Sequence, residues 1–153
     1  MSRQPMKSDE EIETEEKKSD EPIETQLVKA MHDLYESSKN WRSPEQERAV
    51  VAVANGISPL FVIFPTGFEK SSTFLLPAKL KNAGVTIVIT PLIALSDNML
   101  ETCQNAGVDC IFYDHSRPRM TKVVIVMADT AVGKEFTQYA NEIKLMSKLD
   151  RIV

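Results

Sequence analysis

The residues with the clearest capacity for chemistry lie between positions 64 and 71, where the sequence reads Phe-Pro-Thr-Gly-Phe-Glu-Lys-Ser. An apolar run precedes this stretch and a helical pattern follows it, as around a phosphate-binding P-loop. In such a loop, main-chain N–H groups bind phosphate, a lysine reaches the β- and γ-phosphates, and a hydroxyl binds Mg²⁺. Thr66, Gly67, Lys70 and Ser71 occupy suitable positions, with Ser71 as the metal ligand. The spacing therefore predicts a site for ATP with Mg²⁺.

One residue departs from the motif, because Glu69 stands where a glycine normally precedes the lysine. Glycine allows the backbone to approach a phosphate closely, and a carboxylate at this position repels the negative charge of a polyphosphate. We therefore expect ATP binding to be impaired, and whether it persists is left open. The alternative is a plain strand–turn–helix connection in which Lys70 and Ser71 are incidental.

A second Gly-Lys pair occurs at Gly133 and Lys134, again between an apolar run and a helical pattern. The next residue is Glu135, at the position where a Mg²⁺-binding hydroxyl is required. We interpret this stretch as a loop and helix start, with Lys134 on the surface.

The elements that must position these residues alternate in type along the chain. Short apolar runs rich in β-branched residues predict strands, and longer patterns with helical spacing predict helices. A last strand is expected to begin at 152–153. Buried strands separated by helices indicate an α/β fold with a parallel sheet flanked by helices. The expected strands are 60–64, 85–90, 108–113 and 122–127, and the expected helices are 70–81, 91–106 and 133–147.

The N-terminal part has a different composition from the rest. Residues 1–25 contain nine acidic and four basic residues, a net charge of −5, whereas residues 26–153 carry +1. We predict a disordered acidic tail over 1–25 and a single domain over 26–153. That domain opens with a helix from Thr25 and a second helix capped by Ser43, which ends at Gly56. A nearly neutral domain gives no electrostatic indication of nucleic-acid binding.

Several protein classes are excluded by composition. No apolar run approaches the roughly 20 residues that a membrane-spanning helix needs, and the N-terminus lacks the apolar core of a secretory signal. Cys103 and Cys110 are therefore expected to be reduced thiols of an intracellular protein. A structural zinc site is not expected, because these cysteines and the two histidines lack ligand spacing.

Four stretches, in order, resemble the RecQ-like branch of superfamily 2 DNA helicases. Residues 41–46, Trp-Arg-Ser-Pro-Glu-Gln, resemble the adenine-reading motif that precedes the P-loop in this family, with one residue more between Arg and Gln. Residues 64–71 resemble its Pro-Thr-Gly-x-Gly-Lys-Ser loop, and residues 90–95, Thr-Pro-Leu-Ile-Ala-Leu, are similar to motif Ia. Residues 149–153 resemble the approach to motif II. The resemblance implies the N-terminal part of the first RecA-like domain, a P-loop NTPase fold that is truncated here.

The resemblance also implies roles for individual residues. Arg42 would stack on adenine and Gln46 would hydrogen-bond its edge, although helix capping alone explains this stretch equally well. Thr90, Pro91 and Leu92 would contact the single-stranded DNA backbone, and the plainer alternative is a helix started by proline. Single-stranded or forked DNA is the implied partner, and the nucleus is the implied location.

Motif II itself, an Asp-Glu pair that positions Mg²⁺ and water, does not follow in this sequence. No catalytic residue is therefore assigned, and we expect a fragment of an ATP-dependent helicase that does not hydrolyse ATP or unwind DNA as it stands. Whether the chain is an enzyme is left open. The alternative is a non-catalytic pseudo-helicase remnant that binds another protein or single-stranded DNA, and a clipped gene model is a further explanation.

Overall fold

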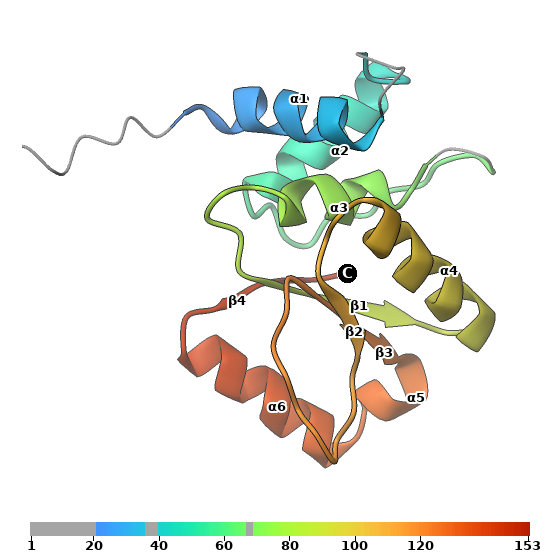
Figure 1. The fold of residues 1–153 in the computed structure, drawn as a ribbon, viewed down its shortest axis with the longest axis vertical. Helices are drawn as coiled ribbons and strands as arrows, with labels where there is room; N and C mark the ends of the chain where they lie inside the picture. Colours follow the sequence, from blue (N-terminus) through green and yellow to red (C-terminus); the bar gives the residue numbers. More distant parts are fainter. Residues whose placement is uncertain (1–20, 36–39, 67–68) are drawn as a thin grey trace, which may run out of the picture.

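The computed structural model describes residues 21–35, 40–66 and 69–153. A four-stranded, wholly parallel sheet lies at its centre, with strand order β2-β3-β1-β4 (Figure 1). The strands are β1 Val85–Thr90, β2 Cys110–Phe112, β3 Val123–Met127 and β4 Leu149–Ile152. The helices are α1 Ile23–Leu34, α2 Pro44–Ala54, α3 Ser72–Ala78, α4 Ile93–Asn105, α5 Ala128–Ala131 and α6 Lys134–Leu145. The expected α/β class and parallel sheet are confirmed.

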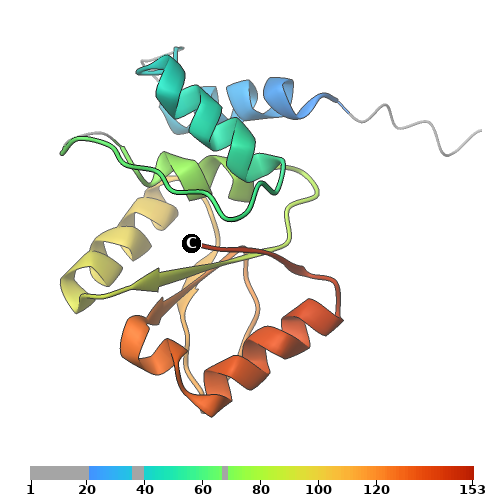
Figure 2. The same ribbon diagram turned by 180° about the vertical axis from the view of Figure 1, so that it is seen from behind.

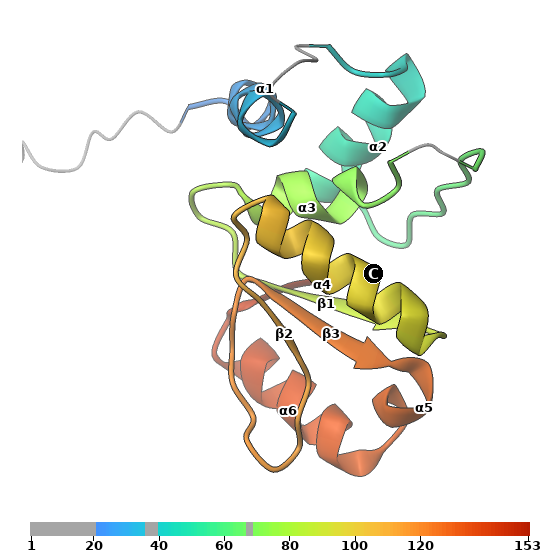
Figure 3. The ribbon, with the colours of Figure 1, turned by 45° about the vertical axis from the view of Figure 1, so that its right-hand side comes forward.

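Both faces of the sheet are buried because successive side chains of a strand point to opposite sides. Val123 and Ile125 of β3 pack with α3 and α4, whereas Val124 and Val126 pack with α6. Figure 3 shows α3 and α4 on one side of the sheet and α5 and α6 on the other. This two-sided burial explains why the strands are nearly continuous runs of apolar residues.

Helices α1 and α2 form a further layer, which packs mainly against α3. Leu27, Met31 and Val50 are buried against Leu76 of α3, in a small apolar cluster of their own. Figure 2 shows α1 and α2 stacked over α3 on the side away from α6. Helix α3 is thereby buried from two directions.

The caps of α2 follow the sequence prediction. The Ser43 hydroxyl accepts a hydrogen bond from the Gln46 N–H at 3.2 Å, and Pro44 is the first helical residue. At the other end, Gly56 has φ +73°, the left-handed conformation that terminates many helices.

The expected strand at 60–64 is wrong. The structure has no strand there, and Phe61 and Ile63 are 89% and 93% exposed. An apolar run becomes a strand only when a neighbouring strand satisfies its N–H and C=O groups. Residues 60–64 pair with no described strand, although β4 is an edge of the sheet and its outer side is unpaired among the described residues. Apolar composition alone could not reveal the missing neighbour.

Other elements also differ from expectation in their bounds. Helix α1 begins at Ile23, inside the tail predicted over 1–25, because Ile23 joins the apolar cluster of α1 and α2. The remainder of that tail, residues 1–20, lies outside the described residues. The short helix α5 forms where a loop was expected, directly after β3. Among the described residues, no helix is long and apolar enough to cross a membrane.

Candidate functional site

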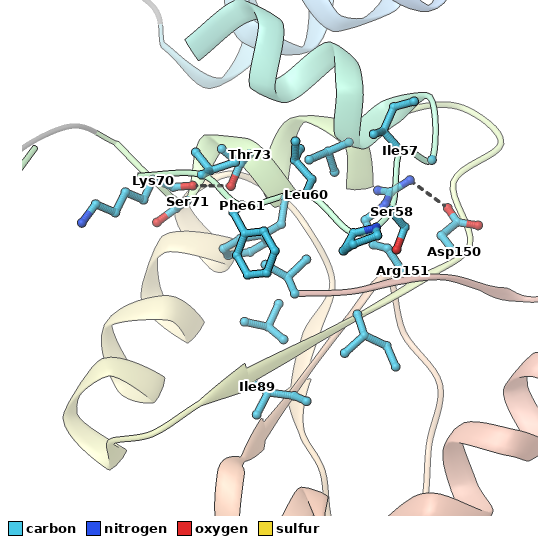
Figure 4. A pocket seen from close by; sticks show the side chains of 18 of the residues that line it. Ile57, Ser58, Leu60, Phe61, Lys70, Ser71, Thr73, Ile89, Asp150 and Arg151 are labelled. Carbon is cyan, nitrogen blue, oxygen red and sulfur yellow. Dashed lines mark hydrogen bonds and ion pairs between the residues drawn. The ribbon is translucent and has the colours of Figure 1, made fainter. Parts of the chain in front are cut away.

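Lys70 and Ser71 lie immediately before α3, at the carboxyl end of the sheet. They line a pocket of about 600 Å³ together with Ile89, near the end of β1, and with Ile152 and Val153 at the end of β4. In open α/β sheets, ligands bind at this end of the strands. Lys70 is exposed, and Figure 4 shows its ammonium group pointing away from the rest of the labelled pocket residues. Lys70 is therefore accessible to solvent, and its ammonium group does not point into this pocket.

The turn before Lys70 is described only in part. Thr66 is exposed at the start of the turn, and Gly67 lies outside the described residues. Glu69 and Lys70 close the turn by accepting hydrogen bonds through their carbonyl groups. The Ser72 hydroxyl donates to the Glu69 carbonyl and the Thr73 hydroxyl to the Lys70 carbonyl, both at 2.6 Å.

Gln46 is buried, with only 3% of its surface exposed, and both ends of its side-chain amide are engaged. Its Oε1 accepts a hydrogen bond from the Arg42 main-chain N–H at 2.9 Å. Its Nε2 donates to the Ser72 hydroxyl at 3.1 Å. Gln46 therefore joins the upstream Trp-Arg stretch to the start of α3. The amide retains one N–H and one oxygen lone pair, but its burial keeps an adenine edge from reaching it in this conformation.

The Arg42 side chain also contacts the loop. Its Nη2 donates to Glu69 Oε1 at 3.1 Å, and both side chains are partly exposed. Tyr35, just after α1, is the third member of this group. Burial, a hydrogen bond to the Glu69 carboxylate and the charge of that carboxylate raise the pKa of Tyr35 far above its usual value. The residue that replaces the glycine is thus paired with the residue that the resemblance assigns to adenine.

The predicted DNA-contacting residues lie at the turn from β1 into α4. Thr90 is buried, and its hydroxyl donates to the Leu92 carbonyl at 3.0 Å, so that side chain stabilises the turn itself. Pro91 and Leu92 are exposed, and the exposure continues through Leu95. Of the three residues, Pro91 and Leu92 have side chains that a ligand can reach.

Arg151 brings an unexpected charge into the pocket lining. Its guanidinium lies 3.5 Å from Asp150, and its Nε and Nη1 are buried without a hydrogen-bond partner. Desolvation lowers the pKa of Arg151, although the nearby Asp150 acts in the opposite direction. Most other lining residues are apolar, as Figure 4 shows for Ile57, Leu60, Phe61 and Ile89.

The described residues fit the phosphate end of a nucleotide better than its metal. Lys70 offers an accessible cation, and Ser71 offers a hydroxyl beside it. Within the described parts of the chain, no three His, Cys, Asp or Glu residues are grouped closely enough to hold a metal ion. Ser71 therefore remains the one predicted protein ligand for Mg²⁺.

Sequence analysis missed Ser72, Tyr35 and Arg151. Ser71 and Ser72 are adjacent hydroxyl residues at a helix start, so the sequence does not distinguish them. Only the fold shows that Ser72 is the buried one. Tyr35 and Glu69 are 34 positions apart, so their proximity could not be inferred from spacing.

The parallel sheet, the flanking helices and a lysine-bearing turn at the carboxyl end of the strands define a RecA-like α/β fold. No protein-family model matches the chain. The chain is similar to RecQ-type helicases over partial stretches, which confirms the resemblance. It is 44% identical over 62 residues to ATP-dependent DNA helicase Q5 of Rattus norvegicus and 38% identical over 87 residues to ATP-dependent DNA helicase Q4 of Homo sapiens.

A bacterial relative shows the same likeness. ATP-dependent DNA helicase RecQ of Synechocystis is 38% identical over 65 residues. These matches cover 40%, 53% and 41% of this chain, but only 6%, 7% and 13% of the rat, human and Synechocystis proteins. The chain therefore corresponds to a small part of each relative.

Proposed function

We propose that the chain is a nucleotide-binding part of a RecQ-like DNA helicase, with ATP bound at Lys70 and Ser71. The observation that carries this proposal is the exposed Lys70 before α3, beside a pocket at the carboxyl end of the parallel strands. A lysine in this position reaches the β- and γ-phosphates of a nucleotide. Ser71 would hold Mg²⁺, which supplies charge neutralisation to the phosphates when it is bound.

DNA is the second ligand that we propose, because the relatives are named as DNA helicases. The exposed surface at Pro91 and Leu92 is the proposed contact for single-stranded or forked DNA. The nucleus is the proposed location for the same reason.

We propose further that the chain binds ATP without hydrolysing it. Hydrolysis needs a carboxylate that positions Mg²⁺ and groups that stabilise the charge developing around the γ-phosphate. Within the described parts of the chain, no three His, Cys, Asp or Glu residues are grouped closely enough to hold a metal ion. Glu69 favours a second candidate, because a carboxylate next to Lys70 repels a polyphosphate. This candidate is a non-catalytic module that binds single-stranded DNA or a protein without dependence on nucleotide.

Titration calorimetry of the full chain with ATP and Mg²⁺ tests the proposal. We expect weak binding that falls at least tenfold in Lys70→Ala, because the phosphates lose their cation. The matched control is Lys134→Ala, which removes the exposed lysine of the other Gly-Lys pair. We expect the control to bind ATP as the wild type does.

Two further measurements separate the candidates. No ATP binding, or equal binding by wild type and Lys70→Ala, would contradict the nucleotide site. Labelled single-stranded DNA that binds equally with and without ATP–Mg²⁺ would favour the nucleotide-independent module. ATP turnover above background that disappears in Lys70→Ala would show that the chain is an active ATPase after all.

A further inference from the structure

Two cysteines lie together where α4 ends and β2 begins. The turn after α4 contains Gly107 at φ +66°, and the Val108 N–H donates to the Cys103 carbonyl at 2.9 Å. This pattern of a left-handed residue and a bond back to the last turn is typical of helix ends. Cys110 then begins β2 and pairs in register with Val123 of β3. Main-chain hydrogen bonds therefore fix the path of the chain between the two cysteines.

The side chains of both cysteines face the same apolar core, between the sheet and helices α3 and α4. Cys103 is fully buried in this core, and Cys110 packs against it from β2. Both are free thiols, and the Cys110 thiol hydrogen-bonds the Cys103 sulfur. Cys110 is partly exposed, so it is the member of the pair that a molecule in solution can reach.

Contact between the two sulfurs makes the thiols unequal. The hydrogen bond from Cys110 stabilises the Cys103 thiolate and lowers the pKa of Cys103, although burial acts in the opposite direction. The same hydrogen bond, with burial and the charge on Cys103, raises the pKa of Cys110. Since the thiolate is the form that attacks a disulfide, Cys103 is the more readily ionised nucleophile and Cys110 the more accessible one.

We propose that Cys103 and Cys110 are a redox-active pair, which a small disulfide such as oxidised glutathione converts into an intramolecular disulfide. The Cys110 thiolate attacks one sulfur of the oxidant, whose S–S bond breaks and releases one glutathione. The Cys103 thiolate then attacks the Cys110 sulfur of this mixed disulfide and releases the second glutathione. Two cysteine thiols are oxidised, one small disulfide is reduced to two thiols, and the departing thiolates take up the two cysteine protons.

The new bond joins the last turns of α4 to the first residue of β2. A short covalent loop of this kind restricts the unfolded chain, so a disulfide that fits the native geometry stabilises the fold. By the same linkage, the native chain should form the disulfide more readily than the unfolded chain, on the order of tenfold or more. A bond that depended only on closeness in sequence would form equally well in both states.

Oxidation of the full chain in a glutathione redox buffer tests the pair. Because the chain has only two cysteines, iodoacetamide should add two labels to the reduced chain and none to the oxidised chain, as measured by intact mass. The oxidised chain should remain a monomer on a non-reducing gel, and dithiothreitol should restore both labels. The ratio of oxidised to reduced chain should fall on the order of tenfold in concentrated urea.

Single substitutions separate the roles of the two thiols. In Cys103→Ala, a mixed disulfide with glutathione should accumulate at Cys110, because the thiol that resolves it is gone. This adduct should form faster than the wild-type disulfide, since the hydrogen bond that raises the pKa of Cys110 is also lost. In Cys110→Ala, no glutathione should attach to the folded chain, because Cys103 is buried. The wild-type experiment needs no substitution and decides the question even where a variant does not fold.

Three results would overturn the inference. They are disulfide-linked dimers in place of the internal bond, a glutathione adduct that persists on the wild-type chain, and oxidation of the native chain that is no more favourable than that of the unfolded chain. None of them bears on the binding of ATP at Lys70, so the proposed function stands or falls separately.

Discussion

At the scale of single residues, the buried amide of Gln46 connects parts of the chain that are far apart in sequence. It accepts from Arg42 and donates to Ser72, so it spans from the start of α2 to the start of α3. A buried polar group that loses its partner costs more free energy than the bond contributes when both partners are present. Gln46 is therefore a structural residue of this site, whatever it contributes to base recognition.

Replacing Gln46 by Ala should lower the free energy of unfolding by about 1–3 kcal/mol, because the Ser72 hydroxyl and the Arg42 N–H lose their partner. Urea unfolding followed by the fluorescence of Trp41, the single tryptophan, measures this change. Gln138→Ala is the control, since Gln138 is exposed and bonds only Glu142 in the same helix at 3.1 Å. We expect the control to stay within about 0.5 kcal/mol of the wild type. Equal losses in the two variants would contradict the role of the relay.

At the scale of elements, two apolar runs of similar composition differ in secondary structure: one forms a strand and the other does not. The run Val85–Thr90 forms β1, which pairs with β3 on one side and β4 on the other. The run at 60–64 has the same strand-forming composition but lies outside the sheet. Composition identified both as strand candidates, and only the presence of neighbouring strands distinguished them.

A pair of isoleucine substitutions measures this difference. Ile87→Ala, in a fully buried position of β1, should cost about 2–5 kcal/mol through lost burial and a cavity. Ile63→Ala should change the free energy of unfolding by no more than about 0.5 kcal/mol, because Ile63 is already exposed. The same urea experiment compares them. A loss above 2 kcal/mol for Ile63→Ala would show that residues 60–64 are buried in solution.

At the scale of the whole molecule, apolar surface and an open sheet edge lie close together. Phe61 and Ile63 are almost fully exposed, and Ile152 and Val153, at the end of the edge strand β4, are about half exposed. An edge strand offers unpaired N–H and C=O groups to any second chain, and adjacent apolar side chains strengthen such contacts.

We therefore expect concentration-dependent self-association in sedimentation velocity experiments. Replacing Phe61 and Ile63 together by Ser should reduce it, because the apolar contribution beside β4 is removed. The control replaces Val132 and Leu145 by Ser, since both are 85% exposed and lie at α6, on the opposite side of the sheet. If the two double variants associate equally, the surface beside β4 is not the one responsible.

The sequence by itself determined the α/β class, the parallel strands at 85–90 and 122–127, the capped helix from Pro44 and the resemblance to RecQ-type helicases. Each of these depends on local periodicity or short motifs, which the order of residues contains directly. Tertiary structure alone decided that residues 60–64 have no strand partner. It also decided that Glu69 is paired with Arg42 and Tyr35 and that Ser72 is buried beneath Gln46. These features depend on contacts between distant segments, and no local pattern specifies which segments meet.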